Sequence, residues 1–435
     1  MKKVALETVG CRLNQYETEQ LALQLTSLGL ERVAYKEAAD LYILNSCTVT
    51  ARADADCRNL ISRAFRKNPK AILVVAGCYV EADKETVKNQ NGVDLVIGND
   101  EKSDLPRILI RKFPDLFPSD VRDRMDSSAL SLPLMTESGL HKDNNLPNRP
   151  MVKIGDGCNQ SCSYCIVPRV RGNLVSFKPD QIIAEIKSLV EAGYHEVVLT
   201  AVHIGKYRYD GLDLGGLALK ILNETALSRL RFSSLEPNEL TDQILELVAH
   251  EDRVCRYLHL PLQSGSDRIL ELMRRPYRRG DYLNVIEIAK KANPDITIGC
   301  DLIVGFPGES DDDFNDSLAV LDSGFIDYGH IFSYSDRPGT AASQMPDKIN
   351  PAVIKARNAT ARRVCALRRA NQMKRYIGKS LPVIPEGISD RNGIFWGVSD
   401  NYIKVSFPSD FKGGRHILNF KSHAACENYL IGSPA

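Results

Sequence analysis

The sequence has no apolar run close to the length of a membrane span, and it carries almost no net charge. A helix that crosses a bilayer needs about 20 consecutive apolar residues, and no stretch of the 435 residues approaches this length. The 56 basic and 55 acidic side chains leave a net charge of +1, so nucleic-acid binding has to be argued from local clusters. The first residues, MKKVALETVG, lead directly into a strand-like pattern with no apolar leader segment. We therefore expect a cytoplasmic protein that does not enter the membrane.

A disulfide framework is also absent, although the chain has 11 cysteines. An odd number of thiols in a long chain without a leader fits a secreted scaffold badly. In a reducing compartment, clustered cysteines bind metal or take part in chemistry, whereas isolated ones pack like small apolar residues. We interpret Cys57, Cys255, Cys300, Cys365 and Cys426 as packing or incidental thiols, because they match no cluster motif.

Residues 1–120 are predicted to form an α/β domain with a doubly wound parallel sheet. Short apolar, β-branched runs bounded by Gly, Asn or Asp are typical of buried strands, and they alternate here with segments of helical spacing. The predicted strands are KVALETV, LYILNS, AILVVAG and VDLVIGN, and the predicted helices cover 16–29 and 54–67. This order favours a parallel sheet with helices on both faces. Residues 121–148 lose the pattern and are expected to form a linker.

Residues 149–374 repeat the alternation six times, which predicts an open, partial (β/α)6 barrel. The predicted strands are MVKIG, HEVVLTAV, RLRFSSL, RYLHLPLQ, ITIGCDLIVGF and IDYGHIFSY. Helical segments are expected near 179–192, 241–250, 279–292 and 311–323, with a long helix over 351–377. The final part, 375–435, has short strand-like runs with Gly and Asn turns, which predicts a small all-β barrel.

Cys158, Cys162 and Cys165 follow the first of these six strands at the spacing C-x3-C-x2-C, in GDGCNQSCSYCIVPRVRG. Three thiolates on one tight loop can hold three irons of a [4Fe–4S] cluster and leave the fourth iron open. A structural zinc site would want a fourth protein ligand at matched spacing, and none follows in this loop. Three core cysteines are a poor alternative, since the intervening residues are polar or small.

The motif, with the aromatic Tyr164 before its last cysteine, resembles the signature of the radical S-adenosylmethionine (SAM) superfamily. In that superfamily the open iron binds SAM, and one electron from the cluster splits SAM into methionine and a 5′-deoxyadenosyl radical. The resemblance implies a partial β/α barrel with its active site at the carboxyl ends of the strands. This is the fold that the periodicity predicts independently.

Cys11, Cys47 and Cys78 are far apart in the sequence, but each follows a predicted strand of the first domain. The carboxyl ends of parallel strands share one edge of a sheet, so three loops can converge there. Three buried thiols near strand ends fit the pattern equally well.

The segments around these cysteines, VGCRLNQYETE, NSCTVTARAD and AGCY, resemble the three cysteine motifs of the methylthiotransferase family. The resemblance continues in RFSSLEP, LHLPLQSGSDRILELMRRPY and DLIVGFPGES and covers nearly the whole chain. It implies a second [4Fe–4S] cluster held by Cys11, Cys47 and Cys78, at which sulfur is bound for transfer. It also implies that the last domain is a TRAM-like RNA-binding module.

Polar residues at strand ends are candidates for holding the adenosyl group of SAM. By resemblance these are Tyr164, Thr200, Ser234, Glu236, Gln263 and Asp301. Polar residues at such positions often only cap backbone groups.

Nucleic-acid binding is predicted from two local clusters of positive charge. Between Lys355 and Lys379 nine basic side chains occur with no acidic residue among them, and four arginines lie between Arg274 and Arg279. Such surfaces suit phosphate contacts. The family resemblance implies tRNA, at its anticodon stem-loop, as the partner, together with a flavodoxin- or ferredoxin-like reductant. We expect a monomer, and the residues do not identify the sulfur donor.

The first motif, GCRLNQYETE, is most similar to the subgroup that modifies N6-threonylcarbamoyladenosine in tRNA. The resemblance implies insertion of a methylthio group at carbon 2 of that adenine, with one SAM as methyl donor and a second as radical source. Alternatives within the family are isopentenyladenosine in tRNA and an aspartate of a ribosomal protein. An alternative of another class is a non-enzymatic RNA-binding iron–sulfur redox sensor.

Overall fold

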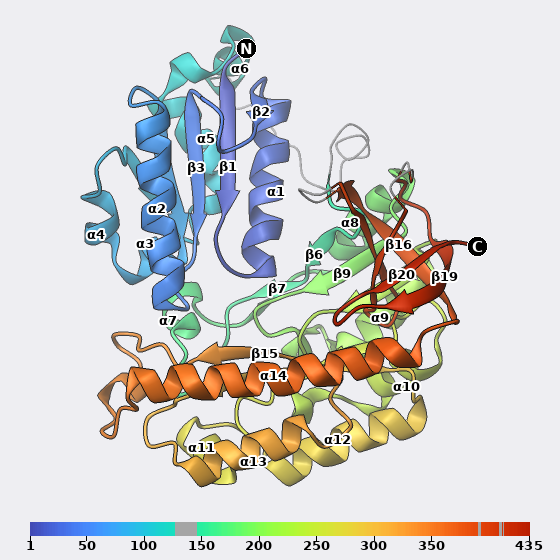
Figure 1. Ribbon diagram of the computed structural model, residues 1–435. Coiled ribbons are helices and arrows are strands. Elements are labelled where there is room, and N and C mark those ends of the chain that lie inside the picture. Colours follow the sequence, from blue (N-terminus) through green and yellow to red (C-terminus); the bar gives the residue numbers. More distant parts are fainter. Residues whose placement is uncertain (127–145, 390–392, 409–410, 412) are drawn as a thin grey trace.

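The computed structural model describes residues 1–126, 146–389, 393–408, 411 and 413–435. It consists of an N-terminal α/β sheet, a central β/α layer and a C-terminal β-barrel (Figure 1). Of the expected linker at 121–148, the first residues belong to helix α6 (Ser119–Asp126), and residues 127–145 lie outside the described residues. No helix in the described ranges has the length and apolar character needed to cross a membrane.

The N-terminal sheet has five parallel strands in the order β2-β1-β3-β4-β5. The strands are β1 (Lys3–Thr8), β2 (Glu31–Val33), β3 (Leu41–Ser46), β4 (Ile72–Gly77) and β5 (Leu95–Ile97). Helices α1 (Arg12–Ser27) and α5 (Leu105–Lys112) pack their apolar side chains on one face. Helices α2 (Ala51–Lys67) and α3 (Cys78–Ala82) pack on the other. The predicted doubly wound sheet is therefore confirmed, and α4 (Lys84–Lys88) adds a short turn beside α3.

The strand order places a topological switch point between β1 and β3. The helix that follows β1 covers one face of the sheet, whereas the helix that follows β3 covers the other. The two connections diverge and leave a crevice at the carboxyl ends of these strands, where ligands of open α/β sheets bind.

The central part has six parallel strands that form an open, partial barrel, as predicted. Strands β6 (Met151–Lys153), β9 (Glu196–Thr200) and β12 (Arg229–Phe232) form one half, and β13 (Tyr257–His259), β14 (Thr297–Val304) and β15 (Tyr328–Ser333) form the other. Single bridges, such as Ser234 with His259, join β12 to β13. The helices that follow these strands are α8 (Pro179–Glu191), α9 (Leu214–Glu224), α10 (Asp242–His250), α12 (Arg279–Ala292) and α13 (Asp311–Leu321).

Helix α9 is not among the helices predicted from the sequence, and its consecutive glycines Gly215 and Gly216 are unfavourable in a helix interior. At Gly215 the Gln243 side chain of α10 lies in the space that a Cβ would take, 2.2 Å away. Helix α9 forms despite these glycines because its apolar side chains are buried in the core of the central part.

Helix α14 (Pro351–Arg375) runs along the central part beside β15 and leads into the C-terminal barrel (Figure 1). The barrel closes in the order β16-β17-β18-β20-β19. Its strands are β16 (Ser380–Ser389), β17 (Phe395–Ser399), β18 (Lys404–Ser406), β19 (Leu418–Ala425) and β20 (Leu430–Pro434). A small apolar core fills it, as expected for an all-β module.

A buried ionic network joins the N-terminal sheet to the central part. Glu17 of α1 lies 2.6 Å from Lys102, 3.0 Å from Lys153 and 2.9 Å from Arg171. Burial alone would raise the pKa of Glu17, but the three cations outweigh it and hold the pKa well below its ordinary value. Breaking such a network leaves an uncompensated buried charge, so the contact fixes how the two parts sit.

Candidate active site

The three N-terminal cysteines meet at the crevice that the strand order creates. Cys11 directly precedes α1, Cys47 follows β3, and Cys78 follows β4 as the first residue of α3. All three line one cavity of about 350 Å³, on the side of the N-terminal sheet that faces the central part. Convergence of separate strand ends thus brings together thiols that are distant in the sequence.

Gly10 allows this close approach. It has φ +107°, a conformation that side-chain-bearing residues rarely adopt, and a Cβ there would lie 2.5 Å from Cys47 Cβ and 2.7 Å from Cys47 Sγ. Only glycine therefore lets the Cys11 loop pack directly against Cys47.

The other three cysteines lie on one loop between β7 (Gly155–Asp156) and α7 (Val167–Arg171), all of them half-buried. Backbone hydrogen bonds hold the loop: the Cys158 N–H donates to the Gly172 carbonyl, at 3.1 Å, and the Ser163 N–H to the Met273 carbonyl, at 3.1 Å. The segment between β13 and β14, which contains Met273, thus holds the cysteine loop in place.

Two cationic or ionisable side chains contact these sulfurs. His203 Nδ1 lies 3.4 Å from Cys158 Sγ, while its Nε2 lies 2.8 Å from a Glu239 carboxylate oxygen. Arg275 Nη1 donates to Cys162 Sγ at 3.2 Å and also pairs with Glu236. Hydrogen bonds to ligand sulfurs tune the potential of an iron–sulfur cluster.

The donor set has the chemistry of iron–sulfur ligation, because each of the two sets offers three cysteine thiols. In the described part of the chain, no three His, Cys, Asp or Glu side chains surround one point closely enough to hold a lone metal ion. A cubane cluster instead binds thiolates spread over its corners. Burial raises the pKa of Cys47 to about 12 and that of Cys165 to about 12, so metal binding must displace a proton from each thiol.

A second cavity, of about 200 Å³, adjoins the first and is lined by Cys165. Both cavities are lined by Asp301 and Val49. Of the residues expected to hold SAM, Thr200 and Ser234 line the first cavity, Tyr164 and Gln263 the second, and Asp301 both. Glu236 lines neither and instead pairs with Arg275 behind the cysteine loop.

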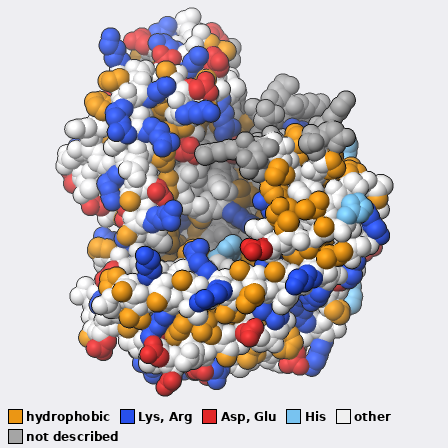
Figure 2. Space-filling view, in the orientation of Figure 1, with side chains coloured by type: hydrophobic (Ala, Val, Ile, Leu, Met, Phe, Trp, Pro, Cys, Tyr) orange, Lys and Arg blue, Asp and Glu red, His pale blue; other side chains and the backbone are white. Residues whose placement is uncertain are grey.

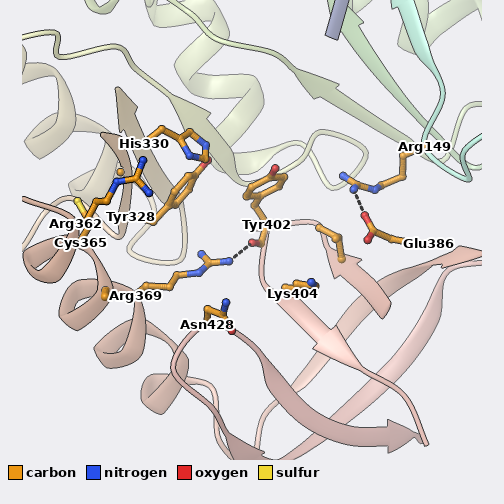
Figure 3. A pocket seen from close by; sticks show the side chains of 13 residues that line it. Arg149, Tyr328, His330, Arg362, Cys365, Arg369, Glu386, Tyr402, Lys404 and Asn428 are labelled. Atoms are coloured by element: carbon orange, nitrogen blue, oxygen red, sulfur yellow. Dashed lines mark hydrogen bonds and ion pairs between the residues drawn. The ribbon is translucent and has the colours of Figure 1, made fainter. Parts of the chain in front are cut away.

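A third hollow, of about 580 Å³, lies between α14, β15 and the barrel, and it reaches the first cavity at His330. Figure 3 shows the rings of His330, Tyr328 and Tyr402 along it, with Arg369 donating to the Tyr402 carbonyl at 3.0 Å. Figure 2 shows a hollow between the N-terminal part and the barrel, with basic side chains at its rim. Aromatic rings beside guanidinium groups suit single-stranded nucleic acid.

The predicted basic clusters are only partly free in the structure. On α14, Arg357 is buried against Glu309 and Arg375 pairs with Asp327, so carboxylates from other elements interrupt the positive surface. Exposed cations remain at Lys355, Arg362, Arg363, Lys374 and Lys379.

The second cluster, Arg274–Arg279, is not a nucleic-acid surface of four free arginines. Arg275 is buried against Glu236, Arg278 pairs with Glu271, and Arg279 pairs with Asp316. Only the exposed Arg274 makes no ion pair with any described residue.

Four of the five remaining cysteines occupy apolar cores. Cys57, Cys255, Cys300 and Cys365 are buried in apolar clusters, which confirms their interpretation as packing residues, while Cys426 is half-buried. Sequence reasoning missed His203, Arg171 and Arg12 at the site. The sequence could have indicated two of them as site residues, since Arg12 directly follows Cys11 and His203 lies just after the carboxyl end of β9.

Comparison with known proteins agrees with this architecture. Residues 152–321 match the model of the Radical SAM superfamily, and residues 3–98 match the uncharacterized protein family UPF0004. The radical SAM methyltransferase TsrM from Kitasatospora setae has a similar fold, with a TM-score of 0.54 and 13% identity over 79% of this chain and 74% of that one.

Curated relatives match nearly the full length. The threonylcarbamoyladenosine tRNA methylthiotransferases of Aquifex aeolicus and Bacillus subtilis are 34% and 33% identical, over 93% and 94% of this chain and 96% and 90% of theirs. A tRNA-2-methylthio-N(6)-dimethylallyladenosine synthase of Thermoanaerobacter pseudethanolicus is 32% identical over 89% of this chain and 83% of its own. The chain therefore belongs to the radical SAM methylthiotransferase family, whose members use two [4Fe–4S] clusters and SAM.

Proposed function

We propose that this enzyme inserts a methylthio group at carbon 2 of N6-threonylcarbamoyladenosine next to the anticodon of tRNA. The observation that carries the proposal is that Cys11, Cys47 and Cys78 share one cavity with Thr200, Ser234 and Asp301. A sulfur-transfer site and a radical-generating site must both reach one carbon atom, and a single cavity bordered by both sets of residues meets this requirement.

When bound, the two clusters and SAM supply the adenosyl radical and the transferable sulfur and methyl group. Cys158, Cys162 and Cys165 would hold the radical-generating cluster, and Cys11, Cys47 and Cys78 the second one. Tyr164, Gln263 and the other strand-end side chains would orient SAM between them. The buried Glu17 network joins the domains that carry the two cysteine sets and so keeps these sets at a fixed separation.

tRNA as substrate is supported by the names of the relatives and by the cationic, aromatic hollow that adjoins the first cavity (Figure 3). Arg362, Arg369 and Lys404 suit backbone phosphates there, and the exposed ring of His330 is available to an unpaired base. An anticodon loop presents such unpaired bases. A small flavin or iron–sulfur protein is the proposed source of electrons.

The threonylcarbamoyl substrate is supported by the first cysteine motif and by the relatives that carry this name, while relatives named for dimethylallyladenosine have similar identity. The test uses protein reconstituted anaerobically with iron and sulfide. Reductant, SAM and tRNA bearing either modification without the methylthio group are added, and nucleosides are analysed by mass. A methylthio product on the threonylcarbamoyl tRNA alone is expected. Product on the dimethylallyl tRNA alone would reassign the substrate, and SAM cleavage without any RNA product would remove tRNA from the proposal.

A further inference from the structure

A cation without a carboxylate partner lies at the sulfur-transfer cavity. Arg12 directly follows Cys11, is half-buried and lines the same cavity as the three N-terminal thiols. In the described part of the chain it makes no ion pair, and it donates a hydrogen bond to the neutral hydroxyl of Tyr402, at 3.2 Å.

The neighbouring charges of this cavity are all engaged. Arg171, the other arginine that lines it, is bound to Glu17 at 2.9 Å and to Asp156 at 3.0 Å. Asp301, the carboxylate that lines it, lies 3.0 Å from His259. A half-buried guanidinium that lacks a carboxylate, beside charged groups that already have partners within the protein, is suited to bind an anion from outside.

We infer that Arg12 recognises the carboxylate of the threonylcarbamoyl group and so selects this base over one with an uncharged N6 substituent. The inference rests on the proposed function. The dimethylallyl group is apolar and offers no partner to a guanidinium, whereas the threonyl carboxylate accepts two parallel hydrogen bonds from one.

The position of Arg12 matches the chemistry of the base. Carbon 2 and carbon 6 of adenine flank the same ring nitrogen, N1, and N6 is attached to carbon 6, so a substituent on N6 extends within several ångströms of carbon 2. The residue that reads this substituent must therefore stand beside the group that delivers sulfur to carbon 2. Arg12 is the immediate neighbour of Cys11, and α1 begins at Arg12, so its backbone is fixed.

The test compares two anticodon stem-loop RNAs, one with N6-threonylcarbamoyladenosine and one in which a carboxamide replaces the carboxylate. The readout is kcat/KM for methylthio product with reconstituted full-length enzyme. The wild type is expected to prefer the acid by about 10- to 100-fold, the value of one charge-assisted pair. In Arg12→Gln, kcat/KM for the acid RNA should fall by this factor, whereas kcat/KM for the carboxamide RNA should not change. The ratio of the two kcat/KM values should therefore approach one.

Arg12→Lys should keep part of the preference, since it retains the charge without the planar fork. Arg66→Gln is the matched control, because Arg66 is exposed in the last turn of α2, far from the cavity. Iron content and thermal midpoint establish that each variant is folded and loaded.

An unchanged acid preference in Arg12→Gln would overturn the inference, and so would equal losses on both RNAs, which would assign Arg12 to the chemistry itself. Equal kcat/KM values of the wild-type enzyme for the acid RNA and the carboxamide RNA would by themselves overturn the inference. The proposed function fails separately, if the wild type modifies dimethylallyl RNA and neither threonylcarbamoyl RNA.

Discussion

Tyr402, in the turn between two strands of the C-terminal barrel, accepts a hydrogen bond from Arg12 at the first cysteine motif, 390 positions away in sequence. Its ring centroid lies 4.5 Å from that of Tyr257 and 5.7 Å from that of Tyr328, so it is inserted among side chains of the central part. Its φ of +61° is unusual for a bulky residue. Tyr402 thus links the barrel to both other parts of the chain, and its backbone is strained. We conclude that the barrel packs directly against the site and is not joined to it by the chain connection alone.

Replacing Tyr402 should therefore weaken the docking of the barrel. Tyr402→Ala removes the ring from its contacts with Tyr257 and Tyr328, and we expect a loss of about 2 kcal/mol in stability. A weaker affinity for tRNA should accompany it. Tyr402→Phe keeps the ring and loses only the hydroxyl, so it should stay near wild type in both measurements. Thermal unfolding and tRNA titration check the prediction, and an Ala variant with unchanged midpoint and affinity would refute it.

The two cysteine sets should separate in their effects on SAM. Cys162→Ala removes a thiol of the C-x3-C-x2-C loop and should abolish formation of 5′-deoxyadenosine. Cys47→Ala should leave SAM cleavage measurable but stop methylthio insertion. Cys57→Ala is the control, since Cys57 is buried near Cys47 and donates only to its carbonyl, at 3.6 Å. Both products are quantified by mass spectrometry, and full methylthio product from Cys47→Ala would contradict the role assigned to this thiol.

Gly10 gives a prediction that leaves all six thiols in place. An alanine at this position would bring its Cβ within 2.5 Å of Cys47 Cβ and force the two loops apart. We expect iron after reconstitution to fall from about eight to about four atoms per chain, since one cubane is lost. Gly193→Ala is matched to it, because Gly193 also has a positive φ, +83°, but has open space around its Cβ position. If both variants bind the same amount of iron, the second cluster does not depend on the close approach of Gly10 to Cys47.

Much of the fold was predictable because it follows from local periodicity. The six central strands were each located by an apolar run, and the spacing of Cys158, Cys162 and Cys165 identifies their loop without any tertiary information. The crevice was predictable for a different reason: Cys11, Cys47 and Cys78 each follow a strand, and parallel strands share one carboxyl edge.

What could not be predicted depends on pairings between distant segments. Arg357 belongs to a run of like charges in the sequence, yet it is buried against Glu309 because α13 and α14 pack together. In the sequence Arg275 belongs to a predicted phosphate-binding cluster, but in the structure its guanidinium donates a hydrogen bond to Cys162. The sequence around these two arginines does not distinguish them from their exposed neighbours. Hydrophobic periodicity shows which apolar residues will be buried, but it does not show which distant carboxylate an arginine will pair with.

Arg275 should tune the potential of the cluster at Cys158, Cys162 and Cys165. Its positive charge and its hydrogen bond to Cys162 Sγ favour the more negative, reduced state. Arg275→Met, made in a Glu236→Gln background so that no buried carboxylate is left unpaired, should lower the reduction potential. The expected shift relative to Glu236→Gln alone is on the order of 50 mV. Redox titration followed by electron paramagnetic resonance measures it. Arg274→Met, at the exposed neighbouring position, should not change the potential, and a double variant that matches its Glu236→Gln parent would exclude the role.

Glu185 should make the stability of the chain depend on pH. Burial on α8 raises its pKa to about 8, although the hydrogen bond from Tyr16 of α1, at 3.3 Å, acts in the opposite direction. In the unfolded chain a glutamate titrates near 4.3, so the folded protein keeps a proton that the unfolded chain releases. Stability contributed by the neutral carboxyl is therefore complete below about pH 4.3, falls as pH rises, and is lost above about 8.

Glu185→Gln removes this dependence while keeping an acceptor for Tyr16. The thermal midpoint of the variant should rise relative to wild type as pH increases from 5 to 8, because only the wild type must hold a protonated carboxyl group there. Glu191→Gln, at the exposed end of the same helix, should follow the wild-type curve throughout. A constant difference between Glu185→Gln and wild type over this range would mean that Glu185 is ionised at the contact between α1 and α8.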